Sequence, residues 1–222
     1  MNPEDLRIPV SLGTTNFMIK YDGGVILASD SRTTRGTFID NRNSRKAINI
    51  SPSDDLFGSI WLARSGNSAH SQVLVRYLYN YLTYHAMELG PNDRIELETV
   101  AHCLQSMTYS NKDYISAGFL LTNGSKIMSV LDSGAVFTHD NFASKGSGSI
   151  YIEGYLKHSL KPGMSVAAAK SVATKAMALA IDGDSASGGN LILIDIKENG
   201  SYTEEVILNT YLRDLIKNQQ SF

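Results

Sequence analysis

Near the start of the chain, Gly13, Thr14 and Thr15 precede a run of alternating apolar and polar residues in the stretch LGTTNFMIKY. If the chain is cut between Gly13 and Thr14, Thr14 becomes an N-terminus that carries a hydroxyl group and a free amine on one residue. An α-amine has an intrinsic pKa of about 7.7–8.0, so it can accept the hydroxyl proton near neutral pH. The chemistry expected of such a residue is nucleophilic attack on a carbonyl carbon.

The alternative for this stretch is purely structural. Threonine is β-branched and favours strands, so an isolated Gly-Thr-Thr step is ordinarily a strand entry and nothing more. Gly13 would nevertheless suit a cut, because it has no side chain to hinder attack by the Thr14 hydroxyl on the preceding carbonyl. The rest of the sequence has to decide between the two interpretations.

Other candidate motifs lack parts that their chemistry requires. KGSGS has no Lys-Ser/Thr ending and no preceding buried strand at the spacing of a phosphate loop, and DGDSASGG lacks the ligand spacing and final glutamate of a calcium loop. The five histidines are scattered without metal-ligand spacing. Cys103 cannot pair catalytically with His102, because neighbouring side chains on a helix point about 100° apart. We expect neither a metal nor a cofactor.

The elements that must position Thr14 are predicted from hydrophobic periodicity and turn signals. Strands are predicted at residues 16–21 and 25–29, joined by DGG, then at 47–50, 57–63, 115–122, 126–131, 136–138, 190–196 and 202–208. Helices are predicted at 67–89, from Asp93 onward with Glu96 completing a capping box, after the glycine turn KGSGS, and at 166–181 behind a Ser165 cap. The remaining C-terminal residues form a polar tail.

Strands, two helices, strands, two helices and strands follow one another, and the many hairpins predict largely antiparallel sheets. Two stacked sheets with a helix pair on each outer face would bury every apolar surface, which predicts an α+β, four-layer αββα sandwich. No repeat, linker or low-complexity segment divides the chain. We therefore expect one domain over residues 14–222, behind a leader of residues 1–13.

Composition narrows the functional classes. The chain has 222 residues, 42% hydrophobic and 19% charged, which is typical of a globular protein. A net charge of -2 without a long basic run gives no reason to expect nucleic acid, and no apolar run reaches the roughly 20 residues that span a bilayer. The lone Cys103 suits a reducing compartment. The leader lacks the basic and apolar regions of a secretory signal and resembles a short pro-segment or a disordered tail.

Five segments then decide the interpretation of Thr14. GTTNFMIKYDGGVILASDSRTT, RK, ARSG, KGSGSIYIEGY and DSASGG, in this order, resemble a catalytic beta subunit of the 20S proteasome, a family of N-terminal nucleophile hydrolases. The resemblance runs from Thr14 to about Leu208. It implies the four-layer αββα fold and a threonine endopeptidase that needs no cofactor and is activated by autolysis at Gly13-Thr14. It also implies a partnership with other alpha and beta subunits in a four-ring barrel, in cytoplasm and nucleus.

The same resemblance implies roles for individual residues. Lys46 would lie beside Thr14 and lower the pKa of its hydroxyl and amine, and Asp30 would hold Lys46 charged and in place. The Gly66 N–H, at a turn into a helix, would form the oxyanion hole. A supporting group around the amine would comprise Ser147, Asp184 and Ser187. Without the resemblance, these charges would be read as solvated surface residues and the glycine as a turn residue.

Substrate preference is expected from the pocket for the side chain before the cut bond. The resemblance places around it Thr33, Ser44, Ile48, Arg64, Ser68 and Gln72. A guanidinium at its base would pair with a carboxylate, so Arg64 predicts cleavage after acidic residues, the caspase-like activity. The alternative is that Arg64 ends a strand and points to solvent. Thr34 and Gly66 would offer backbone groups to a substrate bound as an added strand.

The sequence departs from the family pattern at two places, and two rival functions stay open. SPSDDLFG makes the segment after Lys46 longer than in the usual caspase-like subunit, and Gly183 stands where an arginine often precedes the aspartate. One rival is a non-catalytic structural beta subunit or an unprocessed precursor. The other is the simpler bacterial threonine protease of an ATP-dependent two-ring machine, which is shorter.

Overall fold

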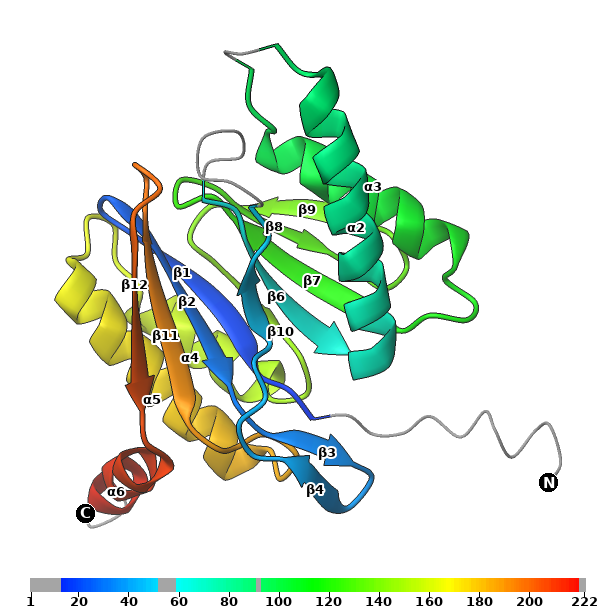
Figure 1. Cartoon of the computed structure of the whole chain (residues 1–222). Coiled ribbons are helices and arrows are strands. Elements are labelled where there is room, and N and C mark those ends of the chain that lie inside the picture. Colours follow the sequence, from blue (N-terminus) through cyan, green and yellow to red (C-terminus); the bar gives the residue numbers. More distant parts are fainter. Residues whose placement is uncertain (1–12, 52–58, 91–92, 220–222) are drawn as a thin grey trace, which may run out of the picture.

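The computed structural model describes residues 13–51, 59–90 and 93–219 and is built of four layers (Figure 1). The first sheet comprises, in spatial order, β10 (Phe142–Lys145), β1 (Asn16–Tyr21), β2 (Gly24–Asp30), β11 (Leu191–Lys197) and β12 (Tyr202–Ile207). The second comprises β5 (Ala47–Asn49), β6 (Trp61–Gly66), β7 (Ala117–Thr122), β8 (Ile127–Val130) and β9 (Val136–His139). Every pairing within both sheets is antiparallel, as predicted.

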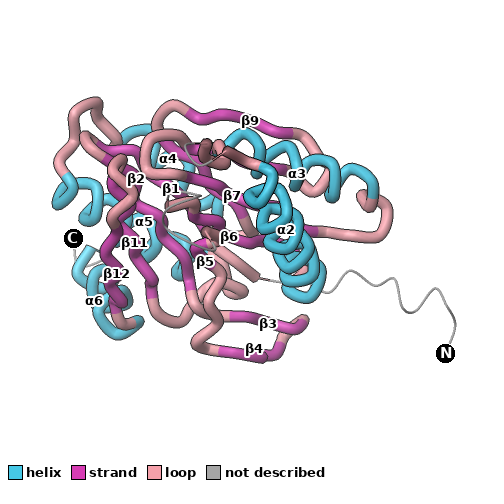
Figure 2. Tube along the Cα trace, turned by 45° about the horizontal axis from the view of Figure 1, so that its top comes forward, coloured by secondary structure: helices cyan, strands magenta, loops and turns pink. Residues whose placement is uncertain are grey.

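Helices cover the outer face of each sheet, which confirms the αββα sandwich. The helices are α2 (Ser68–Glu88) and α3 (Leu97–Ser110) on the second sheet, α4 (Ser149–Ser159) and α5 (Val166–Gly183) on the first, and α6 (Asn209–Gln219) beside α5. A separate hairpin, β3 (Thr33–Arg35) with β4 (Phe38–Asn41), extends from the sandwich near the start of the described chain (Figure 2). Among the described residues, no helix is both long and apolar enough to cross a membrane.

Apolar side chains fill the three spaces between the four layers. Met18, Leu27 and Trp61 belong to the cluster between the two sheets. On the second sheet, α2 contributes side chains four residues apart, such as Leu78 and Leu82, which is the spacing of one helix face. On the first sheet, α5 contributes mainly alanines, which allow the helix to approach the sheet closely.

The helix α2 agrees closely with its prediction from periodicity. Asn67 is its N-cap, and the Asn67 side chain accepts hydrogen bonds from the backbone N–H groups of Ala69 and His70. The helix ends at Glu88, and Leu89, immediately before Gly90, is its C-cap. Ser165 likewise caps α5 as predicted, through a bond from the Ala168 N–H.

Two element predictions were wrong. The helix α3 begins at Leu97 rather than Asp93, and Glu96 at its N-cap position makes no side-chain cap bond; the Asp93 carboxylate instead accepts the N–H of Gly90 and closes the preceding loop. The expected polar tail contains α6, whose Leu212 is fully buried against the α5 side of the first sheet. The prediction also left out β3, β4 and β10, each of only three or four residues. The longer loop at residues 52–58 lies outside the described residues.

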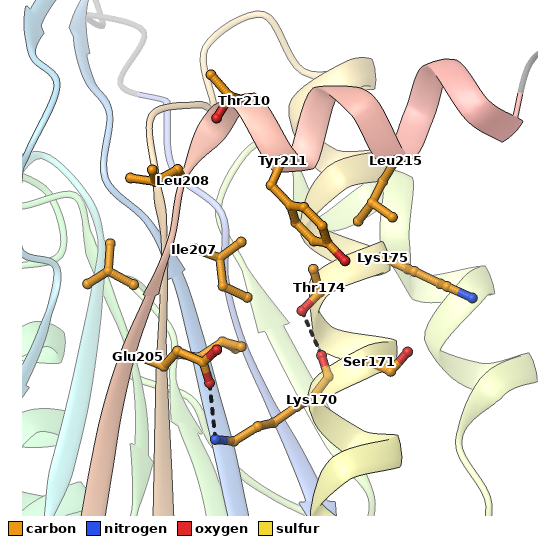
Figure 3. A pocket seen from close by; sticks show the side chains of 12 residues that line it. Lys170, Ser171, Thr174, Lys175, Glu205, Ile207, Leu208, Thr210, Tyr211 and Leu215 are labelled. Atoms are coloured by element: carbon orange, nitrogen blue, oxygen red, sulfur yellow. Dashed lines mark hydrogen bonds and ion pairs between the residues drawn. The ribbon is translucent and has the colours of Figure 1, made fainter.

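A cavity of about 550 Å³ lies between α5, β12 and α6 (Figure 3). Tyr211 and Leu215 project into it from α6, and Lys170 forms an ion pair with Glu205 across it at 3.2 Å. None of the residues predicted to act on a substrate lines this cavity.

The strand ends determine where the candidate site lies. The beginning of β1 and the end of β2 are paired, and the end of β10 is paired with the beginning of β1. In the second sheet, Gly66 at the end of β6 pairs with Ala117 at the beginning of β7. These ends share one edge of the sandwich, so residues distant in sequence meet there.

The burial of α6 predicts a difference between two leucines. Replacing Leu212 with Ala removes a fully buried side chain and should lower the free energy of unfolding by about 2–5 kcal/mol. The same change at Leu208, which is 60% exposed, should have little effect. Urea unfolding followed by the fluorescence of the buried Trp61 measures both; equal midpoints would show that α6 does not pack as described.

Candidate active site

Thr14 lies directly ahead of β1 and is 5% exposed. Its hydroxyl donates a hydrogen bond to the Gly13 carbonyl oxygen at 2.6 Å, and Lys46 Nζ lies 3.4 Å from the same oxygen. The hydroxyl and the ammonium therefore converge on the carbonyl of the peptide bond that joins Gly13 to Thr14.

Gly13 itself is tightly enclosed. Its N–H donates to Thr34 Oγ1 at 3.0 Å, which ties this end of the leader to the β3–β4 hairpin. A Cβ atom on Gly13 would clash with the backbone and side chain of Ala186, in the loop between α5 and β11. Thr34, predicted to offer its backbone to a substrate, thus uses its side chain to hold Gly13.

Lys46 and Asp30 form a buried ion pair at 2.5 Å, and their side chains are 7% and 0% exposed. The Asp30 carboxylate also accepts the N–H groups of Thr15 at 2.9 Å and Gly188 at 3.1 Å. Burial raises the pKa of Asp30 and lowers the pKa of Lys46, while their mutual attraction opposes both shifts. The backbone donors around the carboxylate compensate part of the cost of burying it.

Ser147, Asp184 and Ser187 lie together near the Thr14 nitrogen. Ser147 Oγ accepts the Thr14 N–H at 3.2 Å and donates to Asp184 Oδ2 at 2.6 Å. Ser187 Oγ donates to the same carboxylate oxygen at 2.6 Å and lies 2.7 Å from Thr15 Oγ1. One carboxylate therefore orients two hydroxyl groups, one of which bonds the Thr14 nitrogen.

Gly66 lies at the turn that leads into the helix α2, where the sequence analysis placed it. It is the last residue of β6, with φ +82°, and the helix cap is the next residue, Asn67. A Cβ at Gly66 would lie 2.8 Å from the Ser116 carbonyl oxygen, so both the backbone conformation and the space require glycine. Gly66 and Thr14 line the same small cavity.

The residues predicted for the substrate pocket divide between two neighbouring cavities. The one at Thr14 is only about 20 Å³, room for about one water molecule, and is lined by Thr33, Ser44, Arg64 and Ser68, among others. The second is about 440 Å³ and includes Ile48, Arg64 and Gln72. Arg64 is the residue that both cavities share.

The Arg64 guanidinium has few partners. Its Nη2 donates to the Arg45 carbonyl oxygen at 2.8 Å, whereas its buried Nε has no hydrogen-bond partner among residues 13–51, 59–90 and 93–219. No carboxylate of the described residues forms an ion pair with it, and burial lowers its pKa. The expectation that Arg64 lies at a pocket therefore fits its position better than the alternative of a solvent-facing strand end.

Arg32 and Asn16 are further residues of the site that were not predicted. Arg32 Nη1 donates to the carbonyl oxygens of Ser185 and Ser187, at 3.2 and 3.1 Å, and so holds the loop between α5 and β11. Asn16 Nδ2 donates to the Arg64 carbonyl oxygen at 2.6 Å and joins the two sheets beside the site. Both act on backbone carbonyls, which leave no motif in a sequence.

The arrangement supplies a nucleophile, a cation and oriented hydroxyl groups around one carbonyl, which are the parts of acyl transfer. Within residues 13–51, 59–90 and 93–219, no three His, Cys, Asp or Glu side chains gather as a metal site.

A family model described as "Proteasome subunit" matches residues 10–196. The chain belongs to this family. It is 36% identical over 203 residues to proteasome subunit beta type-6 of Dictyostelium discoideum, covering 89% of this chain and 91% of the relative. It is 32% identical to beta type-6 of Arabidopsis thaliana (88% and 82% covered) and 32% identical to human beta type-9 (86% and 85% covered). The predicted resemblance to proteasome beta subunits is confirmed.

The family also accounts for the predicted partners. Proteasome beta subunits assemble with alpha and other beta subunits in the 20S core particle. Several apolar side chains are exposed in the isolated chain, such as Phe38 at 77% and Tyr84 at 70%. Exposed apolar surface of this kind is typical of a protein that contacts other subunits.

The buried ion pair predicts a large effect of a small change. Asp30→Asn keeps the shape of the side chain but leaves the Lys46 ammonium buried without a countercharge, which should cost about 3–5 kcal/mol of unfolding free energy. Glu98→Gln is a matched control, because Glu98 and Lys126 also lie 2.5 Å apart but are 41% and 51% exposed. Urea unfolding should separate the two variants; similar midpoints would contradict the described burial.

Proposed function

We propose that this proteasome beta subunit is a threonine endopeptidase that cleaves after acidic residues. The observation that supports it best is the convergence of the Thr14 hydroxyl and the Lys46 ammonium on the Gly13 carbonyl oxygen. A nucleophile and a cation at one carbonyl are what addition to that carbonyl requires, because negative charge develops on its oxygen.

Maturation is the first reaction that this arrangement supports. Thr14 Oγ attacks the Gly13 carbonyl carbon, and the charge develops on the oxygen near Lys46 Nζ. The C–N bond then breaks, the hydroxyl proton is transferred to the Thr14 nitrogen, and Gly13 remains as an ester on Thr14. Water hydrolyses this ester, which releases residues 1–13 and leaves a mature domain of residues 14–222.

Peptide hydrolysis repeats this chemistry on a substrate. The free Thr14 amine accepts the hydroxyl proton while Oγ attacks the substrate carbonyl, and the Gly66 N–H stabilises the oxyanion. The amine, oriented by Ser147 and Asp184, gives the proton to the leaving nitrogen. Water then takes the acyl group from Thr14 and completes the turnover.

The preference for acidic residues rests on Arg64. Its buried Nε and the absence of a carboxylate partner among the described residues leave a cation that a substrate carboxylate can satisfy. Gly13 lines the small cavity at Thr14, so loss of the leader would enlarge that cavity toward the one containing Ile48 and Gln72. Backbone groups of Thr34 and Gly66 would bind the substrate as an added strand. We further propose that the protein works in the cytoplasm and nucleus.

Removal of the nucleophile tests the assignment. In the assembled particle, Thr14→Ala should abolish hydrolysis of fluorogenic peptides ending in Glu and spare those ending in Leu or Arg, because other subunits would cut the latter. Thr14→Ser, which keeps a hydroxyl and an amine, should retain measurable cleavage after Glu.

Two outcomes would contradict the proposal. Full post-Glu hydrolysis in the Thr14→Ala particle would remove this chain from that activity. Mass spectrometry of the wild-type chain supplies the second: a mature N-terminus at Thr14 is expected, whereas a retained leader would favour a non-catalytic or unprocessed subunit.

The role of Arg64 has a separate test. Arg64→Met should lower kcat/KM for post-Glu cleavage by about 30-fold or more, because the substrate carboxylate loses its charged partner, while maturation at Thr14 continues. Arg64→Lys keeps the charge but not the planar fork of the guanidinium, so its kcat/KM for post-Glu cleavage should lie between those of the wild type and Arg64→Met. An unchanged preference for Glu in Arg64→Met would return Arg64 to a structural role.

A further inference from the structure

Lys145 lies at the active-site edge of the sandwich, at the end of β10. The residue after it, Gly146, packs so closely on Thr14 that a Cβ there would clash with the Thr14 carbonyl oxygen. Ser147, which bonds the Thr14 nitrogen, follows next. Lys145 therefore stands two residues from the group that orients the nucleophile's own amine.

The side chain of Lys145 points into the space between the two sheets. Ala143, two residues earlier on β10, belongs to the apolar cluster between the sheets, and residues i and i+2 of a strand share a face. Its cross-strand partner is Asn16, whose amide reaches the second sheet at the Arg64 carbonyl. A Cβ added to Gly118 would lie 2.8 Å from Lys145 Nζ, so the bare glycine leaves the space in which the ammonium lies.

Within the part of the chain that the structure describes, the Lys145 ammonium has no close polar partner. Among the described residues, Lys145 Nζ takes part in no hydrogen bond or ion pair; Asp132, which is exposed, acts on it only through longer-range attraction. Burial lowers the pKa of Lys145, yet the residue is only partly covered. A half-buried cation without a countercharge is a favourable place for an incoming anion.

The side chains of Lys145, from β10, and Arg64, from β6, lie on opposite sides of the second sheet at β6. Ala63 belongs to the cluster between the sheets, so Arg64, the next residue, faces outward toward α2, where Gln72 and Val75 line the same cavity. Lys145 approaches from the inner side, where a Cβ on Gly118 would lie 3.2 Å from Ser65 Oγ.

The chemistry of the proposed function distinguishes these two sides. The acyl part of the substrate carries the side chain that Arg64 would bind. The leaving nitrogen must receive its proton from the Thr14 amine, which lies beside Ser147. The departing part of the chain is therefore expected on the side of Ser147, and Lys145 precedes Ser147 by two residues at the end of β10.

We propose that Lys145 is a specificity-determining residue that binds the carboxylate of an acidic residue directly after the cut bond. This inference rests on the proposed threonine peptidase function and extends it to the departing half of the substrate. An enzyme with both cations would favour acidic residues on both sides of the bond it cuts.

Two internally quenched peptides test the proposal in the assembled particle. Both have Glu before the cut bond, and they differ only in Glu or Gln directly after it. The wild type should cut the Glu-Glu peptide with a kcat/KM about 5-fold above that for Glu-Gln, as expected for a partly exposed charge pair. Lys145→Met should bring this ratio to about one, and Lys145→Arg should restore it.

Lys157→Met is the control, because Lys157 is an exposed lysine of α4 and its replacement should leave the ratio unchanged. Equal ratios in wild type and Lys145→Met, with cleavage after Glu intact, would overturn the role of Lys145 alone. A wild-type particle that cuts neither peptide after Glu would overturn the proposed function, and this inference with it.

Discussion

The buried contact between Lys46 and Asp30 is the interaction on which the geometry of the site depends. An ammonium that is 7% exposed keeps its charge only where a carboxylate and backbone donors surround the pair. Asp30 supplies this setting by bonding N–H groups from the start of β1 and from the loop before β11. The pair thus joins both sheets and the α5–β11 loop, and places the cation at the carbonyl ahead of Thr14.

Around that pair, the antiparallel order of the sheets concentrates function at one edge. Thr14 precedes β1, Asp30 ends β2, Gly66 ends β6, and Ser147, which bonds the Thr14 nitrogen, follows β10. Residues that are far apart in sequence become neighbours because hairpins return the chain to the same edge. At this edge, Arg64 lies on the helix-covered side of β6, and Lys145 lies on the side that faces the other sheet.

Much of the fold could be predicted because its signals are local. The turn DGG specified the first hairpin, and leucines at four-residue spacing specified α2. The helix α6 was missed although Leu212, Leu215 and Ile216 stand at helical spacing, because the residues between them are polar and the burial of Leu212 depends on packing against α5. At the site, the resemblance supplied Thr14, Asp30 and Lys46. Contacts made to backbone carbonyls, such as those of Arg32 and Asn16, exist only in three dimensions and could not be predicted.

The close packing of Gly13 against Ala186 has a consequence for how this protein can vary. Attack on the carbonyl carbon before Thr14 is least hindered when the preceding residue has no side chain, and Ala186 leaves no space for one. Any side chain at position 13 would clash with Ala186, so a substitution there disturbs the packing whatever its effect on a reaction at this bond. Substitutions that change the surroundings of this bond and keep the packing must therefore lie at neighbouring positions rather than at Gly13 itself.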